Sequence, residues 1–127
     1  MDIRKKQRAV VAALEDIKAR DIAAFNVTHL TSLFDRVIVA TADSARQTKA
    51  LATHLQEKLK ALGERVYGVE GEVGGEWVLI DAGDIVIHIM QPAARQYYNL
   101  EELWGEPRRR ARRPRANSKT IETAAIR

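Results

Sequence analysis

Two aspartates beside a predicted turn are the residues in this sequence whose type and spacing could most readily support chemistry. Asp81 and Asp84 flank Ala82-Gly83, a two-residue sequence that suits a β-hairpin turn. Two carboxylates this close could share a magnesium ion. The neighbouring strand supplies no third carboxylate, so the pair makes a poor two-metal site. We therefore expect no metal here, although a metal-dependent enzyme using Asp81 and Asp84 stays open as an alternative.

The other residue types that catalyse reactions or bind metals do not occur in a recognisable pattern. His29, His54 and His88 lack the spacing of metal ligands with one another or with nearby carboxylates. Ser44 has no nucleophile-elbow context, and the glycine-containing stretch 71–75 precedes a strand rather than a helix, unlike a phosphate-binding loop. The sequence contains no cysteine, which excludes disulfides and thiolate metal sites. It therefore predicts neither catalytic residues nor a cofactor.

Hydrophobic periodicity predicts eight elements in the order α-β-β-α-β-β-β-α. The helices are predicted over 3–20, 44–62 and 92–103, and the strands over 22–27, 36–41, 66–69, 76–81 and 84–90. Ser44 and Gln47 form a capping box at the start of the second helix, and Gly63 suits its end. The continuous apolar run 37–40 indicates a strand buried on both faces. This order predicts an α/β fold with a mixed sheet of about five strands and flanking helices.

The last two strands carry the most information about function. A turn at Ala82-Gly83 places Asp81 opposite Asp84, Leu79 opposite Val86, and Trp77 opposite His88. Because side chains alternate along a strand, one face of this hairpin is the core. That core face carries Val78, Ile80, Ile85, Ile87 and Ile89.

The opposite face of the hairpin is also apolar, which is unusual for a face in contact with water. It carries Trp77, Leu79, Val86 and His88, with the two aspartates at its turn end. Two interpretations fit: helices cover this face as well, or it is a surface that binds another protein. In the second case the aspartates, which repel each other across the turn, predict a basic patch on the partner.

The last predicted helix adds a second group of aromatic side chains. Tyr97, Leu100 and Trp104 are spaced to share one face, which favours core packing for Tyr97 and Leu100. Tyr98 and Trp104 are better candidates for partial exposure, because each joins an apolar ring to a polar group. The predicted partner-binding residues are therefore Trp77, Leu79, Asp81, Asp84, Val86, His88, Tyr98, Leu103 and Trp104.

The positive charge of the chain is concentrated at its C-terminal end. Residues 105–127 contain eight Lys or Arg and two Glu, a net charge of +6, whereas the whole chain has +4 and residues 1–104 therefore have −2. We expect one α/β domain over 1–104 and a disordered basic tail over 105–127. Such a tail can bind nucleic-acid phosphates in a salt-dependent way, although it lacks aromatic residues that would recognise bases.

The sequence gives no indication of a membrane or secreted location. The basic start of the chain is not followed by an apolar run of the kind found in signal peptides. No stretch approaches the roughly 20 consecutive apolar residues that a membrane-spanning helix needs. We therefore expect a cytoplasmic protein.

Several spaced residues, from Phe34 to Trp104, resemble the bacterial ribosomal silencing factor family, also called Iojap-like. The matching residues are Phe34-Asp35, Val39-Ala40-Thr41 with Ser44, Arg46 and Gln47, Val69-Glu70-Gly71, Trp77 to Asp84, Val86-Ile87-His88, Arg95, Tyr97-Tyr98, Leu100-Glu101 and Leu103-Trp104. The resemblance covers about residues 4–104. Ala82 departs from the bulkier residue expected between the aspartates, and the arginine-rich tail lies outside the pattern.

The resemblance implies a specific function. Members of this family bind a ribosomal protein on the inter-subunit face of the large subunit, block joining of the small subunit, and so repress translation when nutrients are short. Their fold is similar to that of nucleotidyltransferases but lacks the catalytic Gly-Ser and paired-aspartate signature; here too Thr41-Ala42-Asp43-Ser44 is followed by no Asp-x-Asp. A nucleotidyltransferase-like enzyme, an RNA-binding protein that contacts ribosomal RNA through its tail, and a free homodimer that covers the apolar face remain alternatives.

Overall fold

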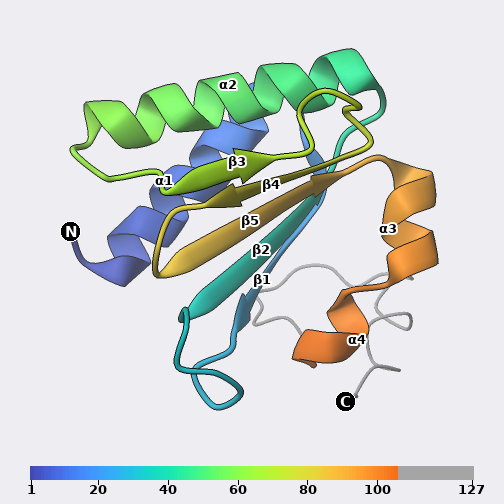
Figure 1. Ribbon diagram of the computed structural model, residues 1–127. Coiled ribbons are helices and arrows are strands. Elements are labelled where there is room, and N and C mark those ends of the chain that lie inside the picture. The colour runs from blue at the N-terminus through green and yellow to red at the C-terminus, as the bar shows by residue number, and fades with distance from the viewer. Residues whose placement is uncertain (106–127) are drawn as a thin grey trace.

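The computed structural model describes residues 1–105, which form one five-stranded sheet with helices on both faces (Figure 1). The helices are α1 (Ile3–Asp16), α2 (Ala45–Ala61), α3 (Pro92–Tyr98) and α4 (Glu101–Trp104), and the strands are β1 (Arg20–Asn26), β2 (Arg36–Thr41), β3 (Gly68–Glu70), β4 (Trp77–Asp81) and β5 (Ile85–Met90). The predicted α/β class is confirmed. Among the described helices, none is long and apolar enough to cross a membrane. The predicted tail lies, from residue 106 onward, outside the described residues.

The sheet is mixed, with strand order β1-β2-β5-β4-β3. β2 and β5 run parallel at its centre, and the other neighbouring pairs are antiparallel. All six residues of β5 are buried, as are five of the six in β2. The apolar run 37–40 therefore lies in the middle of the sheet, as its composition predicts.

Each face of the sheet has its own hydrophobic core. Helices α1 and α2 cover one face and form the larger core, which includes the side chains Val78, Ile80, Ile85, Ile87 and Ile89 of the hairpin. A smaller core lies on the other face, where Ala94 of α3 packs with Phe25, Val37, Val39 and Met90. Trp77, Leu100 and Trp104 pack against the edge of this smaller core. The predicted core face of the hairpin is confirmed.

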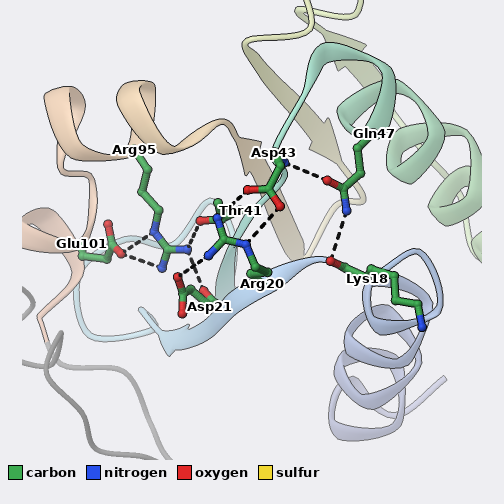
Figure 2. A network of polar contacts seen from close by, with 8 residues as sticks. All are labelled: Lys18, Arg20, Asp21, Thr41, Asp43, Gln47, Arg95 and Glu101. Carbon is green, nitrogen blue, oxygen red and sulfur yellow. Dashed lines mark hydrogen bonds and ion pairs between the residues drawn. The ribbon is translucent and has the colours of Figure 1, made fainter.

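Gln47 joins the start of α2 to the end of α1 (Figure 2). Its backbone N–H donates to the Ser44 hydroxyl oxygen at 3.0 Å, as in a capping box. Its side-chain oxygen, however, accepts from the backbone N–H of Asp43 at 2.7 Å, one residue before the predicted position. Its Nε2 donates to the carbonyl oxygens of Ile17 and Lys18 at 2.9 and 3.1 Å. The predicted first helix stops early, at Asp16, and Lys18 adopts a left-handed conformation, with a φ of 63°, in the turn that leads to β1 at Arg20.

The predicted register of the β4–β5 hairpin is wrong by two residues. The N–H of Ala82 donates to the carbonyl of Ile85 at 2.9 Å, so the turn residues are Gly83 and Asp84. Gly83 has a φ of 90°, and hairpin turns of types I′ and II′ require a positive φ at this first position. The Asp81 carboxylate also accepts from the Gly83 N–H at 2.9 Å, which stabilises this turn.

The new register changes the strand partners but preserves the faces. Asp81 lies opposite Val86, Leu79 opposite His88, and Trp77 opposite Met90. Because the shift is an even number of residues, every side chain stays on its predicted face. The predicted repulsion between Asp81 and Asp84 across the strands is therefore absent from this pairing.

The predicted last helix is broken in two. Asn99 adopts a left-handed conformation with a φ of 45°, which ends α3 at Tyr98 before α4 begins at Glu101. The break separates Tyr97, which is 80% exposed, from Leu100 and Trp104, which pack against the smaller core. The prediction that these three side chains share one face is therefore wrong.

Candidate functional site

Four rings from three elements form an aromatic cluster, which we define as Trp77, His88, Tyr97 and Tyr98. The centroids of the Trp77 and Tyr98 rings are 4.6 Å apart, and those of Trp77 and His88 are 5.9 Å apart. Tyr97 packs edge-on against Tyr98, with a centroid distance of 4.9 Å. The sheet supplies Trp77 and His88, and α3 places Tyr98 against Trp77 and Tyr97 against Tyr98.

The aromatic cluster is exposed at the tyrosines and buried at the histidine. Tyr97 and Tyr98 are 80% and 50% exposed, Trp77 is partly buried, and His88 is 9% exposed. Such a graded surface, with accessible rings held on a buried base, is typical of protein-binding sites. Tyr97 was missing from the predicted site because its spacing assigned it to the core.

The apolar sheet face is covered in one part and partly accessible in another. The part formed by β1 and β2 is covered, because Val37 and Val39 lie in the smaller core. The part formed by β4 remains partly accessible at Trp77 and Leu79. Val86 is largely buried. Among the strand residues that were predicted to bind a partner, the accessible ones are therefore mainly those of β4.

The predicted residues of α4 differ in their surroundings. Leu103 is exposed, whereas the Trp104 ring packs edge-on against Phe34 with a centroid distance of 6.3 Å. Within residues 1–105 the indole N–H of Trp104 is buried and has no hydrogen-bond partner. Trp104 therefore anchors α4 on the smaller core. Of these two side chains, only that of Leu103 is exposed enough for a partner to reach.

His88 is held in its neutral form. Its Nδ1 accepts a hydrogen bond from the indole N–H of Trp77 at 3.0 Å. Burial lowers the pKa of His88 from 6.5 to about 4, because the charged form would lose its hydration. The imidazole is therefore uncharged near neutral pH.

Arg95 ties α3 and α4 to the sheet (Figure 2). Its Nε and Nη2 lie 2.9 and 2.7 Å from the Glu101 carboxylate, and its Nη1 donates to the carbonyl oxygen of Asp21 at 2.6 Å and to the hydroxyl of Thr41 at 2.7 Å. The side chains of Arg95 and Glu101 are only 14% and 6% exposed. Their mutual pairing lets these two charged side chains be buried.

A second arginine beside this network is much more exposed. Arg20 binds both carboxylate oxygens of Asp43, at 3.2 and 2.5 Å, and the two side chains are 49% and 58% exposed. The hydrogen bond from Arg20 lowers the pKa of Asp43. Exposed pairs of this kind contribute little to stability.

The turn aspartates have partners within the chain. The buried Lys6 ammonium lies 2.6 Å from Asp84, 3.0 Å from Glu64 and 2.7 Å from the carbonyl oxygen of Ala82. Burial alone would lower the Lys6 pKa, but the hydrogen bonds and charges of Asp84 and Glu64 outweigh it, so the pKa is raised. Across residues 1–105 no three His, Cys, Asp or Glu residues are grouped to hold a metal ion. Asp84 is paired with the Lys6 ammonium, and Asp81 accepts from the Gly83 N–H of the turn.

Comparison with known proteins finds a family that matches this chain. The family model described as "Ribosomal silencing factor during starvation" matches residues 1–126, which includes the basic tail that the sequence pattern left out. A ribosomal silencing factor from Chromobacterium violaceum is 54% identical over 105 residues, covering 83% of this chain and 86% of that protein. The mouse protein named "Mitochondrial assembly of ribosomal large subunit protein 1" is 31% identical over 98 residues, covering 75% of this chain and 43% of that protein.

The fold agrees with these sequence matches. A crystal structure of a Chromobacterium violaceum protein superposes with a TM-score of 0.82 at 49% identity, covering 94% of this chain and 99% of that chain. The names of the relatives describe a regulatory factor rather than an enzyme. The chain belongs to the ribosomal silencing factor family.

Proposed function

We propose that this protein binds a ribosomal protein on the inter-subunit face of the large ribosomal subunit and blocks joining of the small subunit. Translation is thereby repressed when nutrients are short, and the protein acts in the cytoplasm, where ribosomes assemble. Family membership supports this function, as does the mouse relative whose name refers to the large subunit. The observation that carries the proposal is the accessible part of the aromatic cluster, formed by Trp77, Tyr97 and Tyr98.

This cluster has the properties of an energetically important contact site. Trp and Tyr are over-represented among the residues whose truncation weakens protein complexes most, because they bury a large rigid surface. Here the rings contact one another, so their positions are restricted before any partner binds. Leu79 lies two residues from Trp77 on the same face of β4 and extends the apolar surface.

An acidic edge borders this apolar surface. Asp81 shares the face of Trp77 and Leu79 along β4, and Glu70 of β3 lies directly opposite Leu79. Asp84 lies at the turn but is paired with the Lys6 ammonium, so Asp81 and Glu70 are the better candidates to attract a basic partner. Ribosomal proteins that contact RNA are basic, which makes the charges complementary.

The acidic edge gives a testable prediction about association rates. Replacing Glu70 by Gln and Asp81 by Asn together should slow association with large subunits roughly three- to tenfold at low salt, because charge complementarity accelerates encounter. Asn at position 81 keeps an oxygen for the Gly83 N–H, so the turn is retained. Stopped-flow measurements at low and high salt, with Glu57→Gln on α2 as a control, check this. Equal rates for all three proteins at low salt would exclude electrostatic attraction by this edge.

Co-sedimentation with purified ribosomal subunits tests the proposal as a whole. We expect the protein to pellet with large subunits and not with small ones, and to reduce formation of complete ribosomes from separated subunits. Removing residues 106–127 separates this function from tail-driven RNA binding: the truncated chain should still bind large subunits, though more weakly if the tail contacts ribosomal RNA. Complete loss of binding would favour the tail instead.

A second copy of the chain could cover the aromatic cluster while the protein is free, since exposed apolar patches seldom remain bare. Such a homodimer would have to dissociate before docking. Sedimentation equilibrium with and without Tyr98→Ala would detect it as a loss of dimer in the variant. A monomeric mass at high concentration would argue against it.

A further inference from the structure

We infer that His88 is a positioning residue. It orients the Trp77 indole for docking by accepting a hydrogen bond from the indole N–H. The inference rests on the proposed function, because it assigns to His88 the preparation of the surface that Trp77 presents. His88 itself is largely buried, so it acts through Trp77 rather than through contact with the partner.

The strand register places the two side chains within reach of each other. His88 lies opposite Leu79, and Trp77 lies opposite Met90, so His88 and Trp77 are diagonal neighbours on one face of the sheet. Diagonal neighbours are far apart at their backbones, but long aromatic side chains can meet across that distance. The indole bridges it and brings its Nε1 to 3.0 Å from the Nδ1 of His88.

The hydrogen-bonding properties of the two groups allow this arrangement in only one form. The indole N–H is a donor and never an acceptor, so Nδ1 of His88 must carry a lone pair and the proton must be on Nε2. Burial favours the neutral ring, in which this tautomer exists. A histidine protonated on both nitrogens would have no acceptor to offer.

The hydrogen bond restricts the Trp77 ring on one side, and Tyr98 restricts it on the other. The Tyr98 ring centroid lies 4.6 Å from that of Trp77, at an interplanar angle of 45°. An apolar side chain at position 88 would fill the same space but leave the indole N–H without its acceptor. The ring would then lose orientational order, and ordering it again on docking would reduce affinity.

Two substitutions separate this role from simple packing. His88→Leu keeps volume and removes the acceptor, whereas His88→Asn places a side-chain oxygen close to the position of Nδ1. We expect His88→Leu to weaken binding to large subunits about tenfold, the upper end of the cost of ordering one side chain on docking, and His88→Asn to restore most of that loss. In a Trp77→Phe background, which lacks the N–H, His88→Leu should have little further effect. Equal affinities for the wild-type and His88→Leu proteins would overturn the inference.

Nuclear magnetic resonance of the unaltered protein provides a test that does not depend on a variant's folding. The ¹⁵N signals of His88 should show Nδ1 unprotonated and Nε2 protonated at pH 7, and the Trp77 indole proton should exchange slowly with water. A protonated Nδ1 would contradict the hydrogen bond and with it the inference. The failure of the proposed function can be told apart from the failure of the inference. If the tautomer is as expected but the wild-type protein does not bind large subunits, the proposed function fails while the Trp77–His88 hydrogen bond stands.

Discussion

Replacing Arg95 by methionine is expected to lower the free energy of unfolding by about 3–5 kcal/mol, the usual effect of removing one partner from a buried ion pair. Methionine keeps much of the side-chain volume but leaves the Glu101 carboxylate, which is 6% exposed, without its cation. The hydrogen bonds from Arg95 to Thr41 and to the carbonyl oxygen of Asp21 are lost as well. Urea denaturation followed by circular dichroism measures this difference.

Arg20→Met is the matched control for this prediction. Arg20 also binds a carboxylate through two nitrogens, but both side chains are about half exposed. Its replacement should change stability by only about 0.5 kcal/mol. If the two variants lose similar amounts of stability, the Arg95 network does not hold α3 and α4 in the way described. The double variant Arg95→Met with Glu101→Leu should recover part of the loss, because it removes the stranded carboxylate.

Acidification is expected to remove about 3 kcal/mol of stability through His88 alone. Its pKa is lowered from 6.5 to about 4 in the folded protein, and each pKa unit corresponds to 1.36 kcal/mol. Between these two values the unfolded chain binds more protons than the folded chain, so stability falls as the pH falls. The contribution of the neutral imidazole is therefore fully present above about pH 6.5 and lost as the pH falls through about 4.

A comparison with His88→Asn isolates this contribution from that of the carboxylates. Asparagine does not titrate, so the difference in unfolding free energy between the two proteins should change by about 3 kcal/mol from pH 7 to pH 4. Urea denaturation at intermediate pH values gives the curve. A difference that stays constant with pH would show that His88 titrates alike in the folded and unfolded chains, contrary to its buried position.

Periodicity predicts the faces of the hairpin but not its register, which depends on the turn residues. Alternation of apolar side chains assigns Val78 and Ile80 to the core in either register, because the two registers differ by an even number of residues. The first turn position needs a positive φ, which Gly adopts readily and Ala does not, so turn chemistry favours Gly83-Asp84 over the predicted Ala82-Gly83. The choice depends on the positive φ of Gly83 and its hydrogen bond to Asp81, which periodicity does not contain.

The break in the last predicted helix depends on contacts between distant parts of the chain. Residues 92–103 have helical spacing throughout, and Asn99 alone is a weak signal for an end. The Arg95 side chain reaches the carbonyl of Asp21, 74 positions away, and its pairing with Glu101 fixes the start of α4. Turning Tyr97 outward is a consequence of this arrangement, so the sequence could identify Tyr98 as a contact residue while missing its neighbour.

The same limit applies to Lys6. Arg4, Lys5 and Lys6 form one basic run in the sequence, and helical spacing alone sets Lys6 apart, because it lies four residues before the buried Val10. Lys6 is nevertheless buried, because α1 places it beside Asp84, 78 positions away. A buried lysine needs such partners to stay charged, and only the tertiary structure reveals which lysine of a run has them.

Titration of large ribosomal subunits with the wild-type, Trp77→Ala, Tyr98→Ala and Leu62→Ala proteins tests the central claim most directly. Leu62 is 43% exposed, similar to the 50% of Tyr98, but it lies at the end of α2 on the other side of the sheet. We expect Trp77→Ala and Tyr98→Ala each to weaken binding by a factor of about 30 or more, the effect of losing a hot-spot aromatic residue, while each variant remains folded. Leu62→Ala should bind like the wild type. Wild-type affinity in a folded Tyr98→Ala protein, or an equal loss in Leu62→Ala, would contradict docking through the aromatic cluster.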